Sequence, residues 1–374
     1  MNNKYRNTRF SLVVTAVFVL LLCLPLLQMG LSFYKEPENV EKRKSAEFPK
    51  LENSSLDAYG RYARRFEWYY NDHFGFRKVL VRLNSLLHYH VLHTSPKEMV
   101  VIGKNGWLYY NNPKDGKNLR DYYGKVNFTT TETERINLRL QRLKSRLDSL
   151  HVPVLVVFIP NKHSVYPEYL PSTYSPIRAK ITRENQIDSV FRLSGIPYIN
   201  MQSILLEAKR TYPLPLYYQT DSHWNELGAY IGYRSIMNQL QRKLPVVKSH
   251  TLADYDITVQ RDSGTGDLAN LIFLGGQMTD LQVQLTPKYK ECALLKRERS
   301  KVDSIVYSNT DTTQLHLLMF HDSFARPLRS LLSESFSRSI YLWRKVNMNL
   351  IKKEKPDVLI IEFAERYSDM LLDL

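Results

Sequence analysis

The chain has 374 residues, of which 43% are hydrophobic and 24% charged, and its formal net charge is +15. This length and balance fit one large folded core or two smaller ones, and they exclude a largely disordered chain. No zinc-finger spacing, Walker loop or RNA-binding aromatic motif accompanies the positive charge. We therefore expect no nucleic-acid partner, because scattered Lys and Arg suit anionic lipid headgroups or an acidic polymer instead.

Residues 1–33 predict a cytoplasmic tip and a transmembrane signal anchor. Lys4, Arg6 and Arg9 precede an uncharged, apolar run from Phe10 to Phe33. About 20 apolar residues cross a bilayer as a helix, and the basic flank stays in the cytoplasm. We expect a single-pass protein of the inner membrane, with the rest of the chain extracytoplasmic, in the periplasm. A cleaved signal peptide is the alternative, but no A-x-A site ends the run.

Three further segments follow the anchor. Residues 34–55 are charged, contain Pro37 and Pro49, and predict a linker. Residues 56–95 are aromatic with helical spacing and predict a helical lead-in. Residues 96–374 predict one α/β catalytic domain. Apart from Cys23 in the anchor, the chain has only Cys292, so neither an intramolecular disulfide nor a cysteine metal cluster is expected.

Helical and strand-like patterns alternate through residues 96–374. The clearest helix is Thr131–Leu150, for which Thr131 and Glu134 predict a capping box. The apolar run Val152–Ile159 after it is typical of a buried parallel strand. Met99–Ile102 and Trp107–Tyr110 flank a turn and predict a hairpin. The remaining predicted helices and strands are Lys180–Leu193, Pro197–Ile199, Ile204–Arg210, Leu216–Tyr218, Leu315–Phe320, Ile340–Trp343 and Val358–Ile361. This alternation predicts an α/β fold with a central, mainly parallel sheet.

Three predicted strand ends carry reactive side chains, and α/β folds place their sites at such ends. Ser323 lies between a strand and a predicted helix at 325–332, whose free N–H groups could hold an oxyanion. Asp221 and His223 are two residues apart, so the carboxylate can fix the imidazole tautomer while the other ring nitrogen reaches a hydroxyl. Asn161 and Lys162 follow a third strand. A helix-capping serine and a chance Asp-x-His pair remain the alternatives at this point.

Six sequence blocks, spread over residues 66–366, resemble the SGNH hydrolase-like alginate O-acetylation proteins, the AlgX/AlgJ-like family. In chain order the blocks are 71–77, 103–109, 160–171 in part, Asp221-Ser222-His223-Trp224, Gly266-Asp267-Leu268 and His321-Asp322-Ser323-Phe324. The resemblance implies an SGNH-like three-layer sandwich. It also implies that Ser323 is the nucleophile, His223 the base and Asp221 the residue that orients the base.

The order of these residues is inverted relative to ordinary SGNH hydrolases, which place the serine first, and the alginate group shares this inversion. His321 stands where ordinary members have a glycine, and a histidine adopts a positive φ only reluctantly. We also expect substrate contacts from four residues near the predicted strand ends. These are Asn161, Lys162, Trp224 and Arg326.

The resemblance further implies O-acetyl transfer onto an exported or cell-surface polysaccharide through an acyl-enzyme, without a metal or soluble cofactor. Acetyl-CoA is cytoplasmic, so a membrane-bound O-acyltransferase is expected as the partner that supplies acetyl. Two alternatives remain. A carbohydrate acetylesterase would use the same triad, and a non-catalytic polysaccharide-binding subunit would keep only the fold.

Two other clusters are weaker candidates. His88, His90 and His93 are spaced so that a helix would splay them apart, which disfavours a metal site. Glu362, Glu365 and Arg366 end the last predicted strand, where they suit a structural ion pair or substrate contacts.

Overall fold

The computed structural model describes residues 2–35, 44–111, 118–172, 174, 178–263, 266–299, 304–311 and 315–374. The chain divides into two compact units. One unit comprises residues 1–96 with 270–274, and the other comprises residues 97–269 with 275–374.

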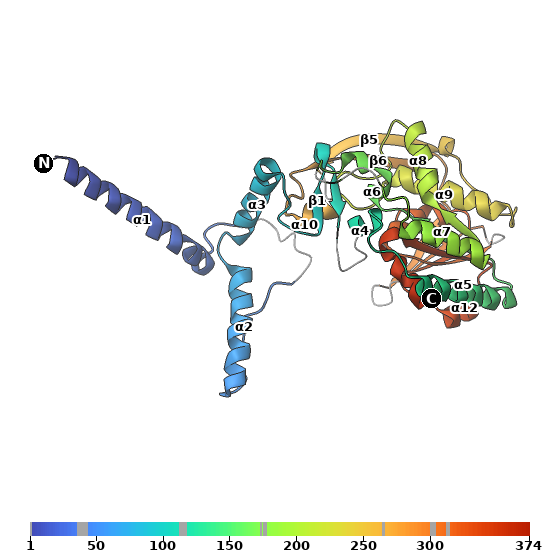
Figure 1. Cartoon of the computed structure of the whole chain (residues 1–374), viewed down its shortest axis with the longest axis horizontal. Helices are drawn as coiled ribbons and strands as arrows, with labels where there is room; N and C mark the ends of the chain where they lie inside the picture. Colours follow the sequence, from blue (N-terminus) through green and yellow to red (C-terminus); the bar gives the residue numbers. More distant parts are fainter. Residues whose placement is uncertain are drawn as a thin grey trace. The chain divides into compact units, whose positions relative to one another are not determined.

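The N-terminal unit is built from three helices, α1 (Asn2–Leu31), α2 (Leu56–His73) and α3 (Arg77–Leu87), and a π-helical turn, His88–Leu92, continues α3 (Figure 1). Within α1, the 22 residues Phe10–Leu31 are long and apolar enough to cross a membrane. The α2–α3 corner packs on the C-terminal end of α1. A Cβ atom on Gly75 would lie 2.1 Å from the carbonyl oxygen of Pro25, so only glycine allows this approach.

The second unit contains a seven-stranded sheet in the order β4-β3-β11-β9-β10-β8-β7. Its strands are β3 (Val154–Ile159), β4 (Tyr198–Asn200), β7 (Ala293–Arg299), β8 (Ser304–Asn309), β9 (His316–Phe320), β10 (Arg338–Leu342) and β11 (Val358–Ala364). Strands β4, β3, β11, β9 and β10 pair in parallel, whereas β8 and β7 add antiparallel pairs. The prediction of a central, mainly parallel sheet is therefore confirmed.

Helices cover both faces of this sheet (Figure 1). Side chains alternate along β3, so Leu155, Val157 and Ile159 enter one apolar cluster while Val154 and Phe158 enter the other. The first cluster includes side chains of α8 (Met201–Thr211), α9 (Glu226–Gln241) and α11 (Leu328–Ser333). The second includes side chains of α5 (Thr130–Ser149), α7 (Arg183–Ser194) and α12 (Met348–Glu354). This three-layer arrangement confirms the predicted SGNH-like fold class.

Smaller elements flank the sheet. Strands β1 (Val100–Ile102) and β2 (Leu108–Tyr110) form the predicted antiparallel hairpin. A longer antiparallel pair, β5 (Tyr255–Ser263) and β6 (Thr279–Pro287), was not predicted. Three further short helices occur among the described residues. They are α4 (Asn118–Tyr122), α6 (Lys162–Val165) and α10 (Asp267–Leu271).

Several predicted details are wrong. The capping box of α5 joins Thr129 and Glu132 instead of Thr131 and Glu134, because the first of three consecutive threonines caps the helix. Residues 216–218 form no strand of the sheet, and Tyr217 makes only an isolated bridge to Trp224. The helix expected at 325–332 begins later, because residues 323–325 form a 3₁₀ turn and α11 starts after Pro327.

Candidate active site

The turn that carries Ser323 follows β9 and is fixed by the carboxylate of Asp322. This carboxylate accepts the N–H of Phe324 at 2.9 Å and, through its other oxygen, the N–H of Ala364 in β11 at 2.7 Å. Asp322 itself is extended, with φ −109°. His321 is not among the described residues with a positive φ, so the turn does not need the glycine of ordinary SGNH hydrolases.

The loop that carries Asp221 and His223 lies between α8 and α9, and hydrogen bonds from buried side chains hold it in place. Lys162, at the end of β3, donates through Nζ to the carbonyl oxygens of Tyr218, Gln219 and Asp221 at 2.8, 2.9 and 2.6 Å. The indole N–H of Trp224 donates to the carbonyl oxygen of Phe324 at 2.9 Å. These bonds join the loop to the serine turn although no sheet strand leads into it.

The structure brings Ser323, His223 and Asp221 together. The Ser323 hydroxyl donates to His223 Nε2 at 2.8 Å, and His223 Nδ1–H donates to Asp221 Oδ1 at 2.6 Å. The side chains of His223 and Asp221 are 25% and 23% exposed. A hydrogen-bonded chain of hydroxyl, imidazole and carboxylate can remove the hydroxyl proton as the oxygen attacks a carbonyl.

The carboxylate of Asp221 is suited to remain charged. Burial alone would raise its pKa, but the hydrogen bond and charge of His223 outweigh burial, helped by the backbone N–H groups of Asp267 and His223. The net effect holds the pKa of Asp221 well below its usual value. An ionised Asp221 can thus orient the imidazole and stabilise it once it accepts a proton.

A second carboxylate, Asp267, supports this loop. It accepts the backbone N–H and the hydroxyl of Ser222, both at 2.7 Å, while its own N–H donates to Asp221 Oδ2 at 2.9 Å. The preceding Gly266 lies against the backbone of Thr220, where a Cβ atom would approach the carbonyl oxygen to 2.3 Å. Asp267 lies in the sequence block 266–268, but no local pattern predicts its role.

Asp221, His223 and Asp267 are also the group of described residues whose ligand atoms could hold a metal ion, since these atoms lie within 4.8 Å of one another. The carboxylate oxygens already accept hydrogen bonds from His223, from Ser222 and from the N–H of Asp267. The group is therefore satisfied without a cation.

Asn161 and Arg366 form a buried polar wall beside the loop. Arg366 donates through Nε to Asn161 Oδ1 at 3.1 Å and through its terminal nitrogens to the hydroxyl and carbonyl of Ser222 at 3.3 and 3.2 Å. Its guanidinium also lies 5.0 Å from the ring centre of Phe324. Glu365 accepts the backbone N–H of Asn161 at 2.8 Å. The residues that follow the last strand, Glu365 and Arg366, thus hydrogen-bond to Asn161 after β3 and to Ser222 in the Asp221–His223 loop.

The four expected substrate contacts have different surroundings. Lys162 and Trp224 are 2% and 1% exposed and hydrogen-bond within the site, Lys162 to the Asp221 loop and Trp224 to the serine turn. Burial lowers the pKa of Lys162 to about 7, although Asp221 opposes this effect. Asn161 is 1% exposed, and its Nδ2 has no hydrogen-bond partner among the residues that the structure describes. Arg326 is exposed at the end of the 3₁₀ turn.

A cavity of about 270 Å³, hereafter the edge pocket, lies where β9, β10 and β11 end. Its lining includes Asp322, which directly precedes Ser323, and the half-exposed rings of Trp343 and Tyr367 at 45% and 36% exposure. Glu362 also lines the pocket. Burial, together with the charge of Asp322, raises the pKa of Glu362 well above its usual value. This pocket could not be predicted from the sequence, because Trp343 and Tyr367 belong to none of the six blocks.

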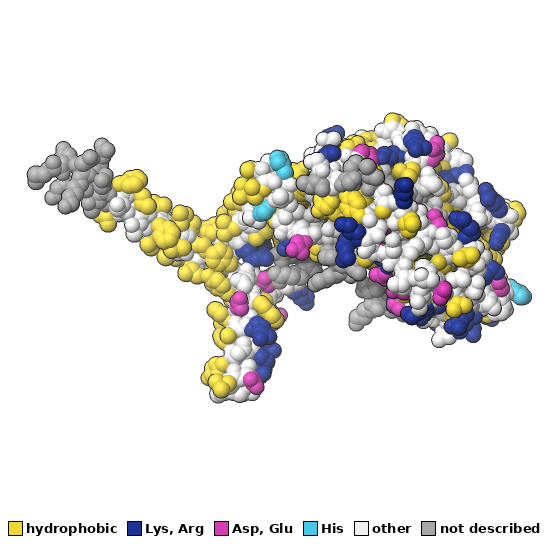
Figure 2. Space-filling model, in the orientation of Figure 1, with side chains coloured by type: hydrophobic (Ala, Val, Ile, Leu, Met, Phe, Trp, Pro, Cys, Tyr) yellow, Lys and Arg dark blue, Asp and Glu magenta, His cyan; other side chains and the backbone are white. Residues whose placement is uncertain are grey.

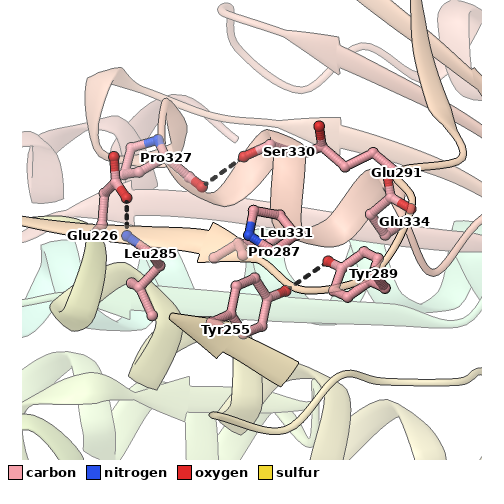
Figure 3. A pocket seen from close by; sticks show the side chains of 10 residues that line it. All are labelled: Glu226, Tyr255, Leu285, Pro287, Tyr289, Glu291, Pro327, Ser330, Leu331 and Glu334. Atoms are coloured by element: carbon pink, nitrogen blue, oxygen red, sulfur yellow. Dashed lines mark hydrogen bonds between the residues drawn. The ribbon is translucent and has the colours of Figure 1, made fainter. Parts of the chain in front are cut away.

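A second cavity, of about 150 Å³, is shown in Figure 3. The hydroxyls of Tyr255 and Tyr289 hydrogen-bond to each other at 2.9 Å, and Glu226 accepts the N–H of Leu285 at 2.7 Å. Glu334 accepts two backbone N–H groups, those of Cys292 and Ala293. Because these polar groups already serve the fold, we assign the cavity no ligand.

The mainly parallel sheet between two helical layers, with the serine after one strand and the Asp-x-His loop opposite it, defines an SGNH hydrolase-like protein. The chain belongs to the family described as SGNH hydrolase-like domain, acetyltransferase AlgX, whose model matches residues 100–312. Asp221 and His223 fall inside the matched range, and Ser323 lies beyond it.

Known proteins are similar over most of the chain. It is 24% identical to the probable alginate O-acetylase AlgJ of Pseudomonas aeruginosa over 84% of this chain and 82% of that protein. PatB1 of Bacillus cereus has a similar fold, with a TM-score of 0.54 and 19% identity over 74% of this chain and 99% of that chain. A DHHW family protein from Eubacterium siraeum gives a TM-score of 0.51 with 15% identity, over 74% and 98% of the two chains.

Proposed function

We propose that this protein is an O-acetyltransferase that acts on an exported or cell-surface polysaccharide through a Ser323–His223–Asp221 triad. The observation that carries the proposal is the continuous hydrogen-bonded chain from the Ser323 hydroxyl through both ring nitrogens of His223 to Asp221. Membership of an acetyltransferase family and similarity to a probable alginate O-acetylase support it.

The reaction divides into two acyl transfers. His223 takes the proton of Ser323 as its oxygen attacks the acetyl carbonyl of a donor ester or thioester. The bond to the leaving group breaks, and His223 returns the proton to that group. A sugar hydroxyl then attacks the acetyl-serine and loses its proton to His223. The acetyl–sugar bond forms, the bond between the acetyl group and Ser323 Oγ breaks, and His223 returns the proton to Ser323.

Negative charge on the carbonyl oxygen needs hydrogen-bond donors in both steps. The backbone N–H of Ser323 is one candidate, because it has no acceptor among the described residues. The side-chain Nδ2 of Asn161 is the second candidate, because it is buried, has no partner within the described parts of the chain and is held in the wall next to the site loop. We assign these two groups to the oxyanion.

The edge pocket offers a place for the sugar acceptor. Trp343 and Tyr367 line this pocket together with Asp322, the residue before Ser323, and the pocket volume of about 270 Å³ suits a single sugar ring. We assign one ring of the polymer to this pocket and the acceptor hydroxyl to the position beside Ser323.

The donor has to reach an extracytoplasmic site. We propose that residues 1–33 anchor the chain in the inner membrane, that 34–55 link and 56–95 lead into a catalytic domain at 96–374, and that a membrane-bound O-acyltransferase passes acetyl outward. The apolar helix Phe10–Leu31 supports the anchor. A reporter fused to the C-terminus should be active only when it is of the exported kind, and a cytoplasmic reporter signal would refute this topology.

A carbohydrate acetylesterase would use the same triad and release acetate to water. The full chain in detergent, given an activated acetyl ester with and without an oligosaccharide, separates these functions. Transfer predicts acetylated sugar in preference to free acetate. Acetate alone, across several polymer types, would favour the esterase.

The binding-subunit alternative has a different test. A structure of PatB1 has been solved with a sulfonyl adduct. By analogy, a sulfonyl fluoride should modify Ser323 of this chain and block both steps, and Ser323→Ala should escape the label. A chain whose polymer acetylation in cells survives Ser323→Ala would instead be a binding subunit.

A further inference from the structure

Helix α3 and the π turn after it carry a row of exposed apolar side chains. Leu80, Leu83, Leu87 and Val91 are 47%, 56%, 50% and 65% exposed. Steps of three and four residues place them on one helix face, and Lys78 and Arg82 fall on the opposite face. Large apolar side chains gathered in this way mark a surface that another molecule covers. We call these four residues the α3 row.

The start of α3 lies at the C-terminal end of α1, within the same compact unit. Gly75 packs against the backbone of Pro25. The ring of Phe76 lies 6.0 Å from the ring of Phe33 and 5.8 Å from that of Tyr34, between centroids. If α1 is the membrane anchor, this corner sits where the anchor leaves the bilayer on the extracytoplasmic side.

The direction of α3 fits the plane of the membrane. Figure 1 shows α2 and α3 leaving the corner in opposite directions, each running across the direction of α1. Figure 2 shows hydrophobic side chains continuing from α1 onto the neighbouring parts of α2 and α3. A helix that crosses a membrane-spanning helix at its outer end runs along the membrane surface.

The chemistry of this segment also fits a lipid surface. A helix with leucines on one face and basic residues on the other lies in the interface, its apolar face buried about 5–10 Å into the boundary of headgroups and acyl chains. Phe33, Tyr34 and Phe76 gather at the corner, and aromatic side chains are favoured at membrane–water interfaces.

We propose that α3 and its π turn lie in the outer interface of the bilayer that holds α1, with the α3 row inserted among the lipid acyl chains. The proposal rests on the proposed anchoring by α1. It gives the chain a second membrane contact, which restrains the segment that leads into the catalytic domain. The occupant of the row is lipid, and a groove on a membrane protein is the competing occupant.

Site-directed spin labelling tests the proposal on the full chain. Single cysteines replace Leu83, Leu87, Phe18 in α1 or the control Leu193, which is 71% exposed on α7. The background is Cys23→Ser/Cys292→Ser. The protein is placed in vesicles of phosphatidylethanolamine and phosphatidylglycerol. Collisions of each label with oxygen, which concentrates in lipid, are compared with collisions with a water-soluble nickel chelate.

The proposal predicts a several-fold higher ratio of oxygen to nickel collisions at Leu83, Leu87 and Phe18 than at Leu193. A lipid-like Phe18 label with water-exposed labels at Leu83 and Leu87 would overturn the α3 proposal alone. A water-exposed Phe18 label would overturn the anchoring and the α3 proposal together. Protection of Leu83 in native membrane vesicles but not in pure lipid would overturn the lipid assignment in favour of a protein groove.

A second variant checks that the row causes the insertion. In a Val91→Cys labelled chain, Leu83→Gln/Leu87→Gln should shift the Val91 label toward water by several-fold in the same ratio. The matched control, Leu138→Gln/Leu193→Gln, alters two exposed leucines of the other unit and should leave the label unchanged. An unchanged Val91 label in the first variant would overturn the proposal. The altered side chains are exposed, so thermal unfolding should be unaffected in both variants.

Discussion

Arg366 donates through Nε to the side-chain oxygen of Asn161 at 3.1 Å, and this bond decides which way the Asn161 amide faces. The amide nitrogen is left buried without a hydrogen-bond partner in the described part of the chain. An unpaired buried donor costs about 1–3 kcal/mol, so folded proteins rarely keep one without a use for it. A developing oxyanion would supply the missing acceptor.

Replacing Asn161 with Ala should lower kcat/KM for an activated acetyl ester by roughly 10²–10³-fold, the usual effect of losing one oxyanion donor. Unfolding stability should fall by about 1–3 kcal/mol, because the substitution also removes Oδ1, the acceptor of the buried Arg366 Nε–H. Steady-state kinetics and a thermal melt measure the two effects. A wild-type rate in Asn161→Ala would remove Asn161 from the oxyanion site.

Replacing Ser323 with Ala should lower the rate of acetyl transfer by several orders of magnitude, since the covalent nucleophile is lost. His223→Ala should do nearly the same, and the double variant should be scarcely worse, because the two residues act as one unit. Ser323→Ala should lower stability by no more than about 0.5–1.5 kcal/mol, because Asp322 caps the turn and the substitution removes one hydrogen bond, that to His223. Rates of single-turnover acetylation in the three variants provide the measurement, and additive losses would contradict a shared mechanism.

The two carboxylates near His223 should differ in importance. Asp221 Oδ1 lies 2.6 Å from His223 Nδ1, whereas Asp267 Oδ2 lies 3.6 Å away and bonds Ser222. Asp221→Asn should lower kcat by about 10⁴-fold, because it no longer fixes the tautomer. Asp267→Asn serves as the matched control and should cost at least about tenfold less. Equal losses in the two variants would show that the assignment of the orienting carboxylate is wrong.

Glu362 should make stability depend on pH. Burial and the charge of Asp322 raise its pKa, so above its ordinary value of 4.5 the unfolded chain loses a proton that the folded chain keeps. The folded state then binds more protons, and stability falls as pH rises from the ordinary pKa toward the raised one. Glu362→Gln cannot ionise.

The Tm of Glu362→Gln relative to the unsubstituted protein should therefore increase between pH 5 and pH 8, in contrast to the exposed control Glu207→Gln. Activity near neutral pH should be largely retained, because Gln resembles the protonated acid and can still accept the Asp322 N–H. A relative Tm that is the same at both pH values would show that Glu362 is ionised in the folded protein.

Trp343→Ala should weaken binding of the sugar acceptor without slowing the reaction of Ser323 with the acetyl donor. Trp343 lines the edge pocket but is absent from the hydrogen bonds of the triad, so hydrolysis of a small acetyl ester should stay near its original rate. Transfer to an oligosaccharide should fall by about 10-fold or more through a higher acceptor KM, as expected for a lost aromatic contact of roughly 1–2 kcal/mol. Trp68→Ala, in the N-terminal unit, is the control. Unchanged transfer by Trp343→Ala would exclude this pocket as the acceptor site.

Periodicity and short motifs were enough to predict the central sheet, because the apolar runs at 154–159 and 358–364 are buried on both faces and read as strands wherever they occur. The same patterns gave a wrong prediction at residues 216–218. This apolar run is not part of the sheet, because Lys162 hydrogen-bonds to Tyr218 and Tyr217 bridges to Trp224. The patterns also missed β5 to β8, although β5 and β6 do alternate apolar and polar residues, with Ile257 and Val259 in one strand and Leu281, Val283 and Leu285 in the other.

The candidate site divides in the same way. Ser323, His223 and Asp221 could be proposed from local sequence because each lies in a short block with a recognisable residue order. Asp267, Arg366 and Trp343 acquire their places only from contacts across the fold, some of them more than a hundred residues away in sequence, as between Arg366 and Ser222. No local pattern could identify those partners.

The order of strands in the sheet has a consequence for how the protein matures. Strand β11 follows every other strand in the chain, yet it lies between β3 and β9 and pairs with both. It also supplies the Ala364 N–H that holds Asp322 next to the serine. With the exported topology proposed above, a chain that emerges from a translocation channel N-terminus first would expose an unfilled gap in its sheet until residues 358–364 have crossed. The nucleophile would then be held in place only at the final folding step, which would delay reactivity until translocation is nearly finished.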